Sequence, residues 1–223
     1  MKVEELWRYP VKSMRGEPLS EAEIALDGIV GDRLVHVENG RGVITARTHP
    51  RLLGFAGTIG DDGDTLVDGV PWSDPRVAER VRHAVGDDMR LVVNDGSVRF
   101  DVLPLLVATD GAIAAFGRDG RRLRPNIVVG GVDGLAERRW EGHGMVIGTV
   151  AIYLHSLRER CVMTTYDPDT LEKDREVLRD IHRRFGGLLA LNAAVLRPGV
   201  VHVGDPVRVL AEDETREILA AGS

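Results

Sequence analysis

Short apolar stretches separated by turn residues run through most of this chain and limit the folds open to it. Residues 33–38 alternate apolar and polar side chains, Asn39 and Gly40 follow, and residues 42–47 look like a returning strand. An Asn-Gly pair between two such stretches predicts a β-hairpin. Only a few stretches, such as 74–85, have the character of a helix. Many short strands with glycine-rich turns favour a barrel or a sandwich over alternating strand–helix units.

We therefore expect a β-rich α+β protein. Its 223 residues are enough for one large domain or two small ones, with an ample core in either case. The strand pattern is weakest at residues 94–101. This weak point predicts a boundary between a first domain, residues 1–97, and a second domain, residues 98–223.

The composition excludes several classes of protein. A formal net charge of −6 argues against a general nucleic-acid binder. A single cysteine excludes a disulfide scaffold and an all-cysteine iron–sulfur cluster. The chain has no apolar run approaching the roughly 20 residues that span a bilayer and no signal-peptide pattern at its start. We expect a cytoplasmic protein that binds neither nucleic acid nor membrane.

The single cysteine, Cys161, is either a buried hydrophobe or the reactive atom of a site. Free cysteines often pack in cores as small apolar side chains. Here, however, Arg160 precedes the thiol and a Thr-Thr-Tyr-Asp-Pro run, residues 164–168, follows it. Positive charge stabilises a thiolate, which is the form that binds metals or acts as a nucleophile. The flanking residues therefore favour the reactive interpretation.

Two other segments combine small polar residues with basic ones. The first is residues 9–13, Tyr-Pro-Val-Lys-Ser, together with Arg33, and the second is Arg124-Pro125-Asn126 ahead of an apolar strand. Arginine recognises phosphate through paired hydrogen bonds, and asparagine can donate to and accept from a heterocycle edge. Together with the cysteine segment, they predict a pocket for an anionic heterocyclic ligand with a thiol at its edge. The seven histidines show no spacing typical of a zinc site.

Taken in order, these segments resemble those of the MOSC family (molybdenum cofactor sulfurase C-terminal domain) preceded by its N-terminal β-barrel region. The pattern is most similar to the mitochondrial amidoxime-reducing component and its bacterial counterparts. The resemblance covers nearly the whole chain. The matching segments are residues 9–13, 28–33, 45–52, 124–128, 160–168, 197–199 and 203–207.

The resemblance implies a MOSC β-barrel packed against an N-terminal β-barrel-like domain, with the molybdenum cofactor (molybdenum on molybdopterin) held between them. Cys161 would be the metal ligand and a catalytic residue. Asp167, the second catalytic candidate, would position an oxygen ligand of the metal or simply cap its loop. The cofactor-binding residues implied by the same motifs are Lys12, Ser13, Arg33, Thr109, Arg124, Asn126, Arg160 and Thr164.

The activity implied by the resemblance is that of an oxidoreductase. It would reduce small N-hydroxylated or N-oxide substrates with electrons from a separate electron-transfer protein or reductase. Two alternatives stay open: a sulfur carrier or sulfurtransferase that uses a persulfide on Cys161, and a non-catalytic carrier of the molybdenum cofactor. Metal content distinguishes the reductase from the sulfur carrier, because sulfur transfer requires only a nucleophilic thiol.

The chain departs from the family pattern at residues 185–192, where reductase-type relatives show a Phe-Gly-Gln-Asn type sequence, and at two single residues. Glu159 stands where a serine is common before the Arg-Cys pair, and Leu171 stands where the loop usually has a glycine. These differences leave open a further possibility, a family member adapted to other chemistry.

Overall fold

The computed structural model describes residues 1–94, 96 and 99–221, which form a β-rich α+β fold with four α-helices. The expected boundary between residues 97 and 98 lies outside the described residues, and the division into two domains there stays a prediction. The strands are β1 (Lys2–Arg8), β2 (Glu17–Leu19), β3 (Glu21–Ala25), β4 (Gly28–Ile29), β5 (Val35–Asn39), β6 (Gly42–Ile44), β7 (Gly57–Ile59), β8 (Thr65–Val67), β9 (Val70–Pro71), β10 (Arg90–Val93), β11 (Leu105–Thr109), β12 (Ile127–Gly130), β13 (His143–Ile147), β14 (Val150–Glu159), β15 (Leu188–Arg197), β16 (Gly199–His202) and β17 (Val207–Val209). The helices are α1 (Pro75–Val85), α2 (Asp110–Phe116), α3 (Arg175–Phe185) and α4 (Glu212–Ala221), with 3₁₀ turns η1 (Pro50–Gly54), η2 (Gly120–Leu123), η3 (Ala136–Arg139) and η4 (Val162–Thr165).

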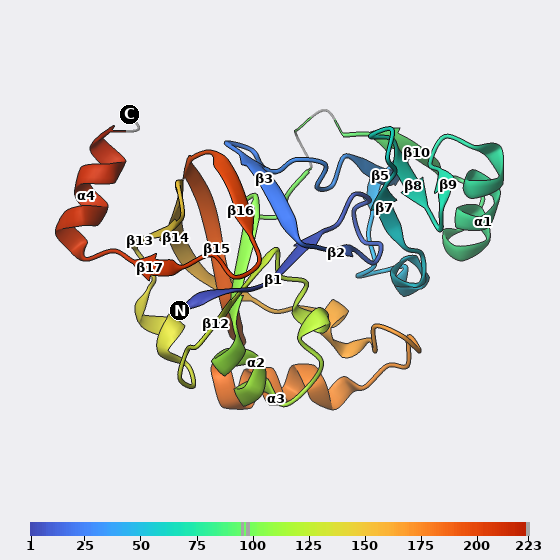
Figure 1. Ribbon diagram of the computed structural model, residues 1–223. Helices are drawn as coiled ribbons and strands as arrows, with labels where there is room; N and C mark the ends of the chain where they lie inside the picture. Colours follow the sequence, from blue (N-terminus) through green and yellow to red (C-terminus); the bar gives the residue numbers. More distant parts are fainter. Residues whose placement is uncertain (95, 97–98, 222–223) are drawn as a thin grey trace.

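One large sheet organises most of the molecule (Figure 1). Its eight strands run in the order β17-β13-β14-β15-β11-β12-β1-β2, and only β11 and β12 pair in parallel. The sheet curls until its two ends approach each other: Val3 N donates to Asp205 O at 2.9 Å and Val207 N donates to Met1 O at 3.1 Å. An isolated bridge between Lys2 and Pro206, rather than a continuous ladder, joins these ends. The result is a barrel-like sheet that is not fully closed.

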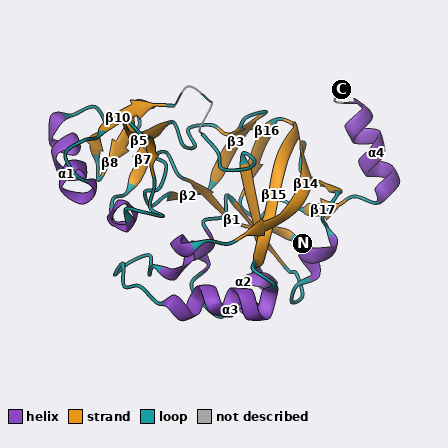
Figure 2. Ribbon diagram, turned by 180° about the vertical axis from the view of Figure 1, so that it is seen from behind, coloured by secondary structure: helices purple, strands orange, loops and turns teal. Residues whose placement is uncertain are grey.

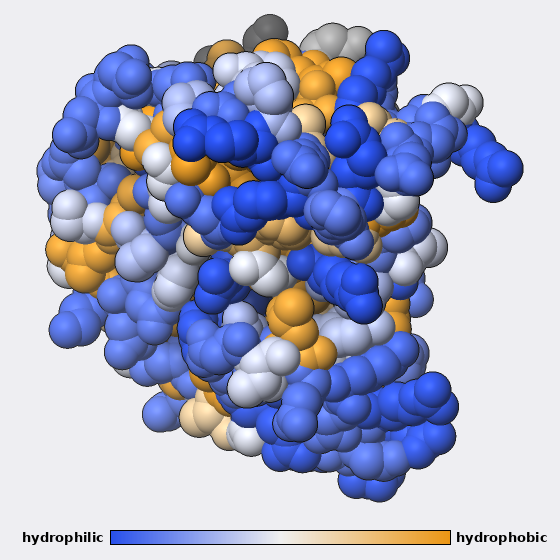
Figure 3. All heavy atoms as spheres, turned by 90° about the vertical axis from the view of Figure 1, so that its right-hand side faces the viewer, coloured by the Kyte–Doolittle hydropathy of each residue, from blue (hydrophilic) through white to orange (hydrophobic). Residues whose placement is uncertain are grey.

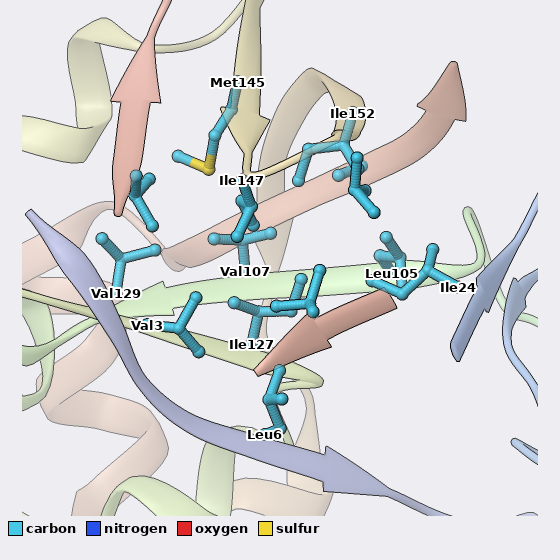
Figure 4. Packing of buried hydrophobic residues seen from close by; sticks show 14 of the residues in the cluster. Val3, Leu6, Ile24, Leu105, Val107, Ile127, Val129, Met145, Ile147 and Ile152 are labelled. Atoms are coloured by element: carbon cyan, nitrogen blue, oxygen red, sulfur yellow. The ribbon is translucent and has the colours of Figure 1, made fainter. Parts of the chain in front are cut away.

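The interior of this sheet is an apolar core (Figure 4). Val107 on β11, Ile127 and Val129 on β12, and Met145 on β13 are fully buried in it. Successive strand residues point to opposite faces, so Val128 lies on the outer face of β12, where α2 packs. Both faces of β12 are thereby buried, which explains why residues 127–129 are continuously apolar rather than alternating.

A second, smaller unit carries its own core. It contains the sheets β10-β5-β6 and β7-β8-β9 together with α1. The predicted hairpin is confirmed, since Asn39 pairs with Gly42 at the turn between β5 and β6. The predicted helix is confirmed as well: α1 begins after Asp74, whose carboxylate accepts from Arg76 N at 2.8 Å. Seen from the side of α1, the surface is mostly hydrophilic, with small and separate hydrophobic areas (Figure 3).

The first 30 residues tie the two units together. Strand β3 pairs with β16 near the other end of the chain, and Ile24 belongs to the core of the large sheet. Between β1 and β2 the chain crosses into the smaller unit, where Val11 forms an isolated β-bridge with Val35 and Arg15 forms one with Ala56. This crossing segment places residues 9–13, Tyr-Pro-Val-Lys-Ser, between the two cores.

The helices α2 and α3 lie together on one side of the large sheet, whereas α4 extends from its far end (Figure 2). Phe116 of α2 and Ile181 of α3 belong to a third apolar cluster. Thr109 begins α2, because its hydroxyl accepts from Ala112 N at 3.1 Å. None of the helices within the described residues is long and apolar enough to cross a membrane.

Asn126, just before β12, links this strand to β11 and β1 through side-chain hydrogen bonds. Its Oδ1 accepts from Leu106 N at 3.1 Å, and its Nδ2 donates to Trp7 O at 3.3 Å. The side chain is 1% exposed, so water cannot replace these partners.

We predict that Asn126→Ala lowers the free energy of unfolding by about 1 to 3 kcal/mol, because it leaves buried backbone groups without partners. Urea denaturation of the purified protein measures this. Asn39→Ala is the control, since the Asn39 side chain hydrogen-bonds only to Arg41 N among the described residues, in an exposed turn; it should change stability by less than about 0.5 kcal/mol. Equal losses in the two variants would contradict the assigned role of Asn126.

Candidate functional site

A cleft between the large sheet and the smaller unit gathers most of the residues singled out in the sequence. Its walls include Lys12, Ser13, Arg33, Arg124, Asn126, Arg160, Cys161 and Thr164, which come from both parts of the fold. We call it the Cys161 cleft. Two of the ten predicted residues, Thr109 and Asp167, do not line it.

Cys161 lies where the long strand β14 gives way to a 3₁₀ turn. Arg160 N donates to Gly187 O at 2.9 Å, which anchors the end of the strand. The Cys161 carbonyl then accepts from both the amide and the hydroxyl of Thr164, at 3.1 and 2.9 Å. Cys161 itself is half-buried. These bonds fix the backbone around the thiol and leave its sulfur at the wall of the cleft.

The cleft is strongly cationic although the protein is acidic. Seven basic side chains line it, against only two carboxylates, Asp101 and Glu159. The whole chain, by contrast, has a formal net charge of −6. Concentrating positive charge at one concave site favours an anionic ligand. The seven are Lys12, Arg33, Arg47, Arg122, Arg124, Arg158 and Arg160.

Asp101 is the counter-charge for three of these cations. Its carboxylate lies 3.1 Å from Lys12 Nζ, 2.7 Å from Arg47 Nη2 and 3.2 Å from Arg158 Nη2. Burial acts to raise the pKa of Asp101, but the three cations outweigh it and hold that pKa below its usual value. The carboxylate therefore stays ionised at neutral pH and occupies the cations that an external anion would otherwise meet.

Arg124 forms no ion pair with a carboxylate among the described residues. It follows η2 in a left-handed conformation, with φ 56°, and its guanidinium stacks 4.3 Å from the centre of the Tyr9 ring. Burial lowers the pKa of Arg124 to about 10 and raises that of Tyr9 to about 12, so the arginine is charged and the phenol neutral at pH 7. Among the described residues, no acceptor hydrogen-bonds to its guanidinium. A charged group with unused donors at a cleft wall is suited to bind an anion.

Two further arginines are fixed by backbone and carboxylate groups. Arg160 Nη2 donates to Leu123 O at 2.6 Å, and burial lowers the pKa of Arg160 to about 10. Arg122 donates to Thr164 O at 3.3 Å and to Asp167 Oδ2 at 2.9 Å. In both side chains the buried Nε has no hydrogen-bond partner among the described residues.

Backbone strain is concentrated at the same cleft. Six described non-glycine residues have a positive φ, and three of them line it: Ser13 at 71°, Arg33 at 52° and Arg124 at 56°. Such conformations cost free energy and persist where the surrounding structure enforces them, often at functional sites. The strain thus supports a functional role for the cleft independently of its charge.

Thr109 and Asp167 do not line the cleft, and the structure gives each of them a local capping contact. Thr109 is fully buried at the start of α2 and does not reach the cleft, because its hydroxyl is committed to the helix cap. Asp167 caps its own loop by accepting from the amides of Asp169 and Thr170, both at 3.0 Å. Its other oxygen pairs with Arg122. Of its two expected roles, the loop cap is the one that its contacts match.

Asn126 reaches the cleft with part of its hydrogen-bonding capacity already used by the fold. Its side-chain oxygen and nitrogen are already bonded to Leu106 and Trp7. Ser13 is in a similar position, since its hydroxyl accepts from Ala46 N at 3.0 Å. Both residues shape the cleft through its backbone.

Several cleft residues were missed by reasoning from the sequence. Arg47 approaches Asp101 and also the Cys161 thiol; burial acts to lower the pKa of Arg47, but these two neighbours raise it. Arg158 precedes Arg160 by two positions, the spacing that puts both side chains on one face of a strand, and this signal could have identified it. Asp101 carried no local signal, because it lies in the segment that looked like a boundary.

The two single-residue differences from the family pattern have distinct structural settings. Glu159 lines the Cys161 cleft and is one of its two carboxylates. Leu171 adopts a left-handed conformation, with φ 60°, at which glycine is favoured. Leu171 packs partly against the core of the smaller unit, and this contact offsets some of the strain.

Comparisons with known proteins relate the chain to described families. Two family models match the chain: the MOSC N-terminal beta barrel domain over residues 1–94 and the MOSC domain over residues 113–208. Human mitochondrial amidoxime-reducing component 1 is 27% identical over 286 residues, covering 94% of this chain and 83% of that protein. The mouse protein of the same name is 29% identical over 282 residues, covering 94% and 82%. Molybdenum cofactor sulfurase of Bombyx mori is 30% identical over 101 residues, covering 42% of this chain and 12% of that protein.

We predict that Asp101→Asn strengthens the binding of inorganic pyrophosphate by about tenfold, because three cations lose their internal counter-charge. Isothermal titration at neutral pH measures the two affinities. The same substitution should destabilise the ligand-free protein at pH 7. A carboxylate with a lowered folded-state pKa stabilises above its usual value of 3.8 and loses that effect as the pH falls below it.

The difference in melting temperature between wild type and Asp101→Asn should therefore shrink as the pH is lowered through 3.8. Asp61→Asn is the control, since Asp61 is exposed in the turn before β8 and forms no ion pair with a described residue. Unchanged pyrophosphate affinity in Asp101→Asn would show that its carboxylate does not compete with external anions.

Proposed function

Because the chain belongs to the MOSC family, we propose that it binds the molybdenum cofactor in the Cys161 cleft and reduces N-hydroxylated or N-oxide substrates. The observation that carries this proposal is the convergence of seven basic side chains from both parts of the fold around the single thiol. Relatives named for amidoxime reduction match 94% of the chain. A match over nearly the whole chain supports the same class of activity for this protein.

The residues of the cleft fit a phosphorylated, sulfur-containing cofactor. Lys12 and Arg33 supply positive charge for its phosphate, and Arg124 offers unused donors to its heterocycle or phosphate. The described residues contain no cluster of three or more His, Cys, Asp or Glu side chains able to hold a metal ion. Cys161 would thus supply one ligand to a metal that arrives with its other ligands already in the cofactor. Thiolate is a soft ligand suited to such a centre.

When bound, the molybdenum cofactor supplies two-electron redox chemistry at a labile oxygen position. The protein's own residues would hold it and shape its surroundings. Arg47 provides positive charge beside the Cys161 sulfur, an environment typical of metal-binding thiolates. Asp167 holds Arg122 in place at the cleft wall and thus acts as a positioning residue.

The net reaction converts an N–OH group to N–H and water, and it takes up two electrons and two protons. A separate electron-transfer protein or reductase would supply the electrons. A small-molecule substrate would enter from the open side of the cleft, where Asp101 and Arg47 are partly exposed. A cytoplasmic location, expected from the sequence, stays a prediction.

Sulfur transfer is the second candidate function. Its support is the similarity to the silkworm molybdenum cofactor sulfurase, which is limited to 101 residues. In that case the Cys161 thiolate would attack the outer sulfur of a donor persulfide; the donor's S–S bond would break, its thiolate would leave, and Cys161 would pass the sulfur on to an acceptor. The same cationic surroundings would stabilise that anion.

We predict that protein produced in a host that supplies the cofactor reduces an aromatic amidoxime to its amidine when a chemically reduced dye provides electrons. Cys161→Ser should lower the rate at least about 100-fold, since the thiolate is the metal's only protein ligand in this proposal. Product formation is followed by chromatography.

The matched control is Ser156→Ala, which alters a side chain bonded to Asn192 near the cleft without removing a charge. Full activity in Cys161→Ser would overturn the reductase proposal. An inactive wild type that acquires a persulfide on Cys161, seen by mass spectrometry of the intact protein, would favour sulfur transfer instead.

A further inference from the structure

A second cavity lies directly beside the Cys161 cleft. It encloses about 240 Å³, and it shares Arg122, Arg124 and Met163 with the cleft. Its remaining lining comes from three parts of the chain: residues 7–16 at the start, Leu53 and Ala56 in the smaller unit, and Arg121, Tyr166 and Pro168 in the loops beside the large sheet. The two spaces therefore lie on either side of a common wall that contains two arginines.

The walls of the second cavity are mostly aromatic and apolar. Trp7, Tyr9 and Tyr166 contribute rings, while Leu53 and Met163 contribute apolar side chains. An engineered apolar cavity of about 150 Å³ is large enough to bind benzene. A cavity of about 240 Å³ can thus hold one six-membered ring together with a small substituent. Aromatic walls favour a flat ring, which they contact by stacking or edge-to-face packing.

Two guanidinium groups in this cavity have a buried Nε that has no acceptor among the described residues. Arg15 donates from Nη2 to Gly54 O at 3.1 Å, while its buried Nε has no partner. The side chain of Arg122 is 9% exposed, and its buried Nε is also unpartnered. Buried donors are nearly always satisfied in folded proteins, so unused ones beside a cavity indicate a ligand that accepts hydrogen bonds.

Arg15 also differs from its neighbours in charge balance. Arg121, on the same wall, pairs with both Asp119 and Asp169, and Arg122 pairs with Asp167. Arg15 forms no ion pair with a carboxylate among the described residues. The second cavity thus combines flat apolar walls with two guanidinium groups, those of Arg15 and Arg124, that form no ion pair among the described residues, and this combination is suited to a planar anion.

We propose that the second cavity binds a monocyclic aromatic carboxylate, with its ring against Trp7 and Tyr166 and its carboxylate on Arg15 and Arg122. A carboxylate is planar and matches the fork of a guanidinium group. Phosphate monoesters fit less well, because the apolar walls would not replace the hydration of a doubly charged group. This binding site does not depend on the proposed reductase function, since none of its contacts involves Cys161.

Benzoate is the probe for this site. We expect saturable binding to the full-length wild-type protein by isothermal titration, accompanied by a change in tryptophan fluorescence because Trp7 lines the cavity. Arg15→Gln should weaken benzoate binding by about tenfold or more, the loss expected for a charge-assisted hydrogen bond. Arg51→Gln removes an exposed charge from the same unit and should leave the affinity unchanged.

A second variant tests the location without changing charge. Ala56 lines the second cavity but not the Cys161 cleft, so Ala56→Leu should fill the space and abolish benzoate binding. Pyrophosphate binding in the Cys161 cleft should persist in this variant. The proposal is overturned if wild type shows no saturable binding up to about 10 mM benzoate. It is also overturned if Arg15→Gln and Arg51→Gln bind benzoate equally or if Ala56→Leu still binds benzoate. Binding of neutral benzyl alcohol to wild type as tight as that of benzoate would overturn it as well.

Discussion

Repulsion among the basic side chains of the Cys161 cleft is the constraint around which this site is built. Like charges held close together in a partly buried space destabilise the fold unless other groups compensate them. The chain compensates them in different ways. Asp101 neutralises Lys12 and two arginines, the Tyr9 ring lies against Arg124, and a backbone carbonyl accepts from Arg160. These compensations are incomplete, which leaves the cleft ready for an anion.

The fold supplies the positions that this arrangement requires. Cys161 comes just after β14, one of the two ten-residue strands of the large sheet, so its backbone is anchored by a rigid element. Arg124 precedes β12, which is buried on both faces, and its left-handed conformation directs the chain out of η2. Lys12 lies between β1 and β2, in the segment that crosses into the smaller unit. Neither unit alone could assemble the cleft, because its cations come from both.

Sequence reasoning succeeded where the signal was local. The Asn39-Gly40 turn and the helix over residues 74–85 depend on neighbouring residues, and both were predicted correctly. The family resemblance named ten residues, and eight of them line the cleft. Asp101 was missed because its three cationic partners are far away in the sequence. Thr109 has a sequence context that also suits a helix cap, and only the structure distinguished this role from ligand binding. The Nε groups of Arg15 and Arg122 became informative only once their burial was known.

Molybdenum content is the most direct test of the central claim, that the Cys161 cleft holds the molybdenum cofactor. Elemental mass spectrometry gives metal per chain for protein made in a cofactor-competent host, with Cys161→Ser and Arg124→Ala prepared in parallel. The account predicts near-equimolar molybdenum in wild type and a sharp fall in both variants, with each variant still folded by circular dichroism. Wild type without molybdenum, from a host whose other molybdenum enzymes are loaded, would contradict the account.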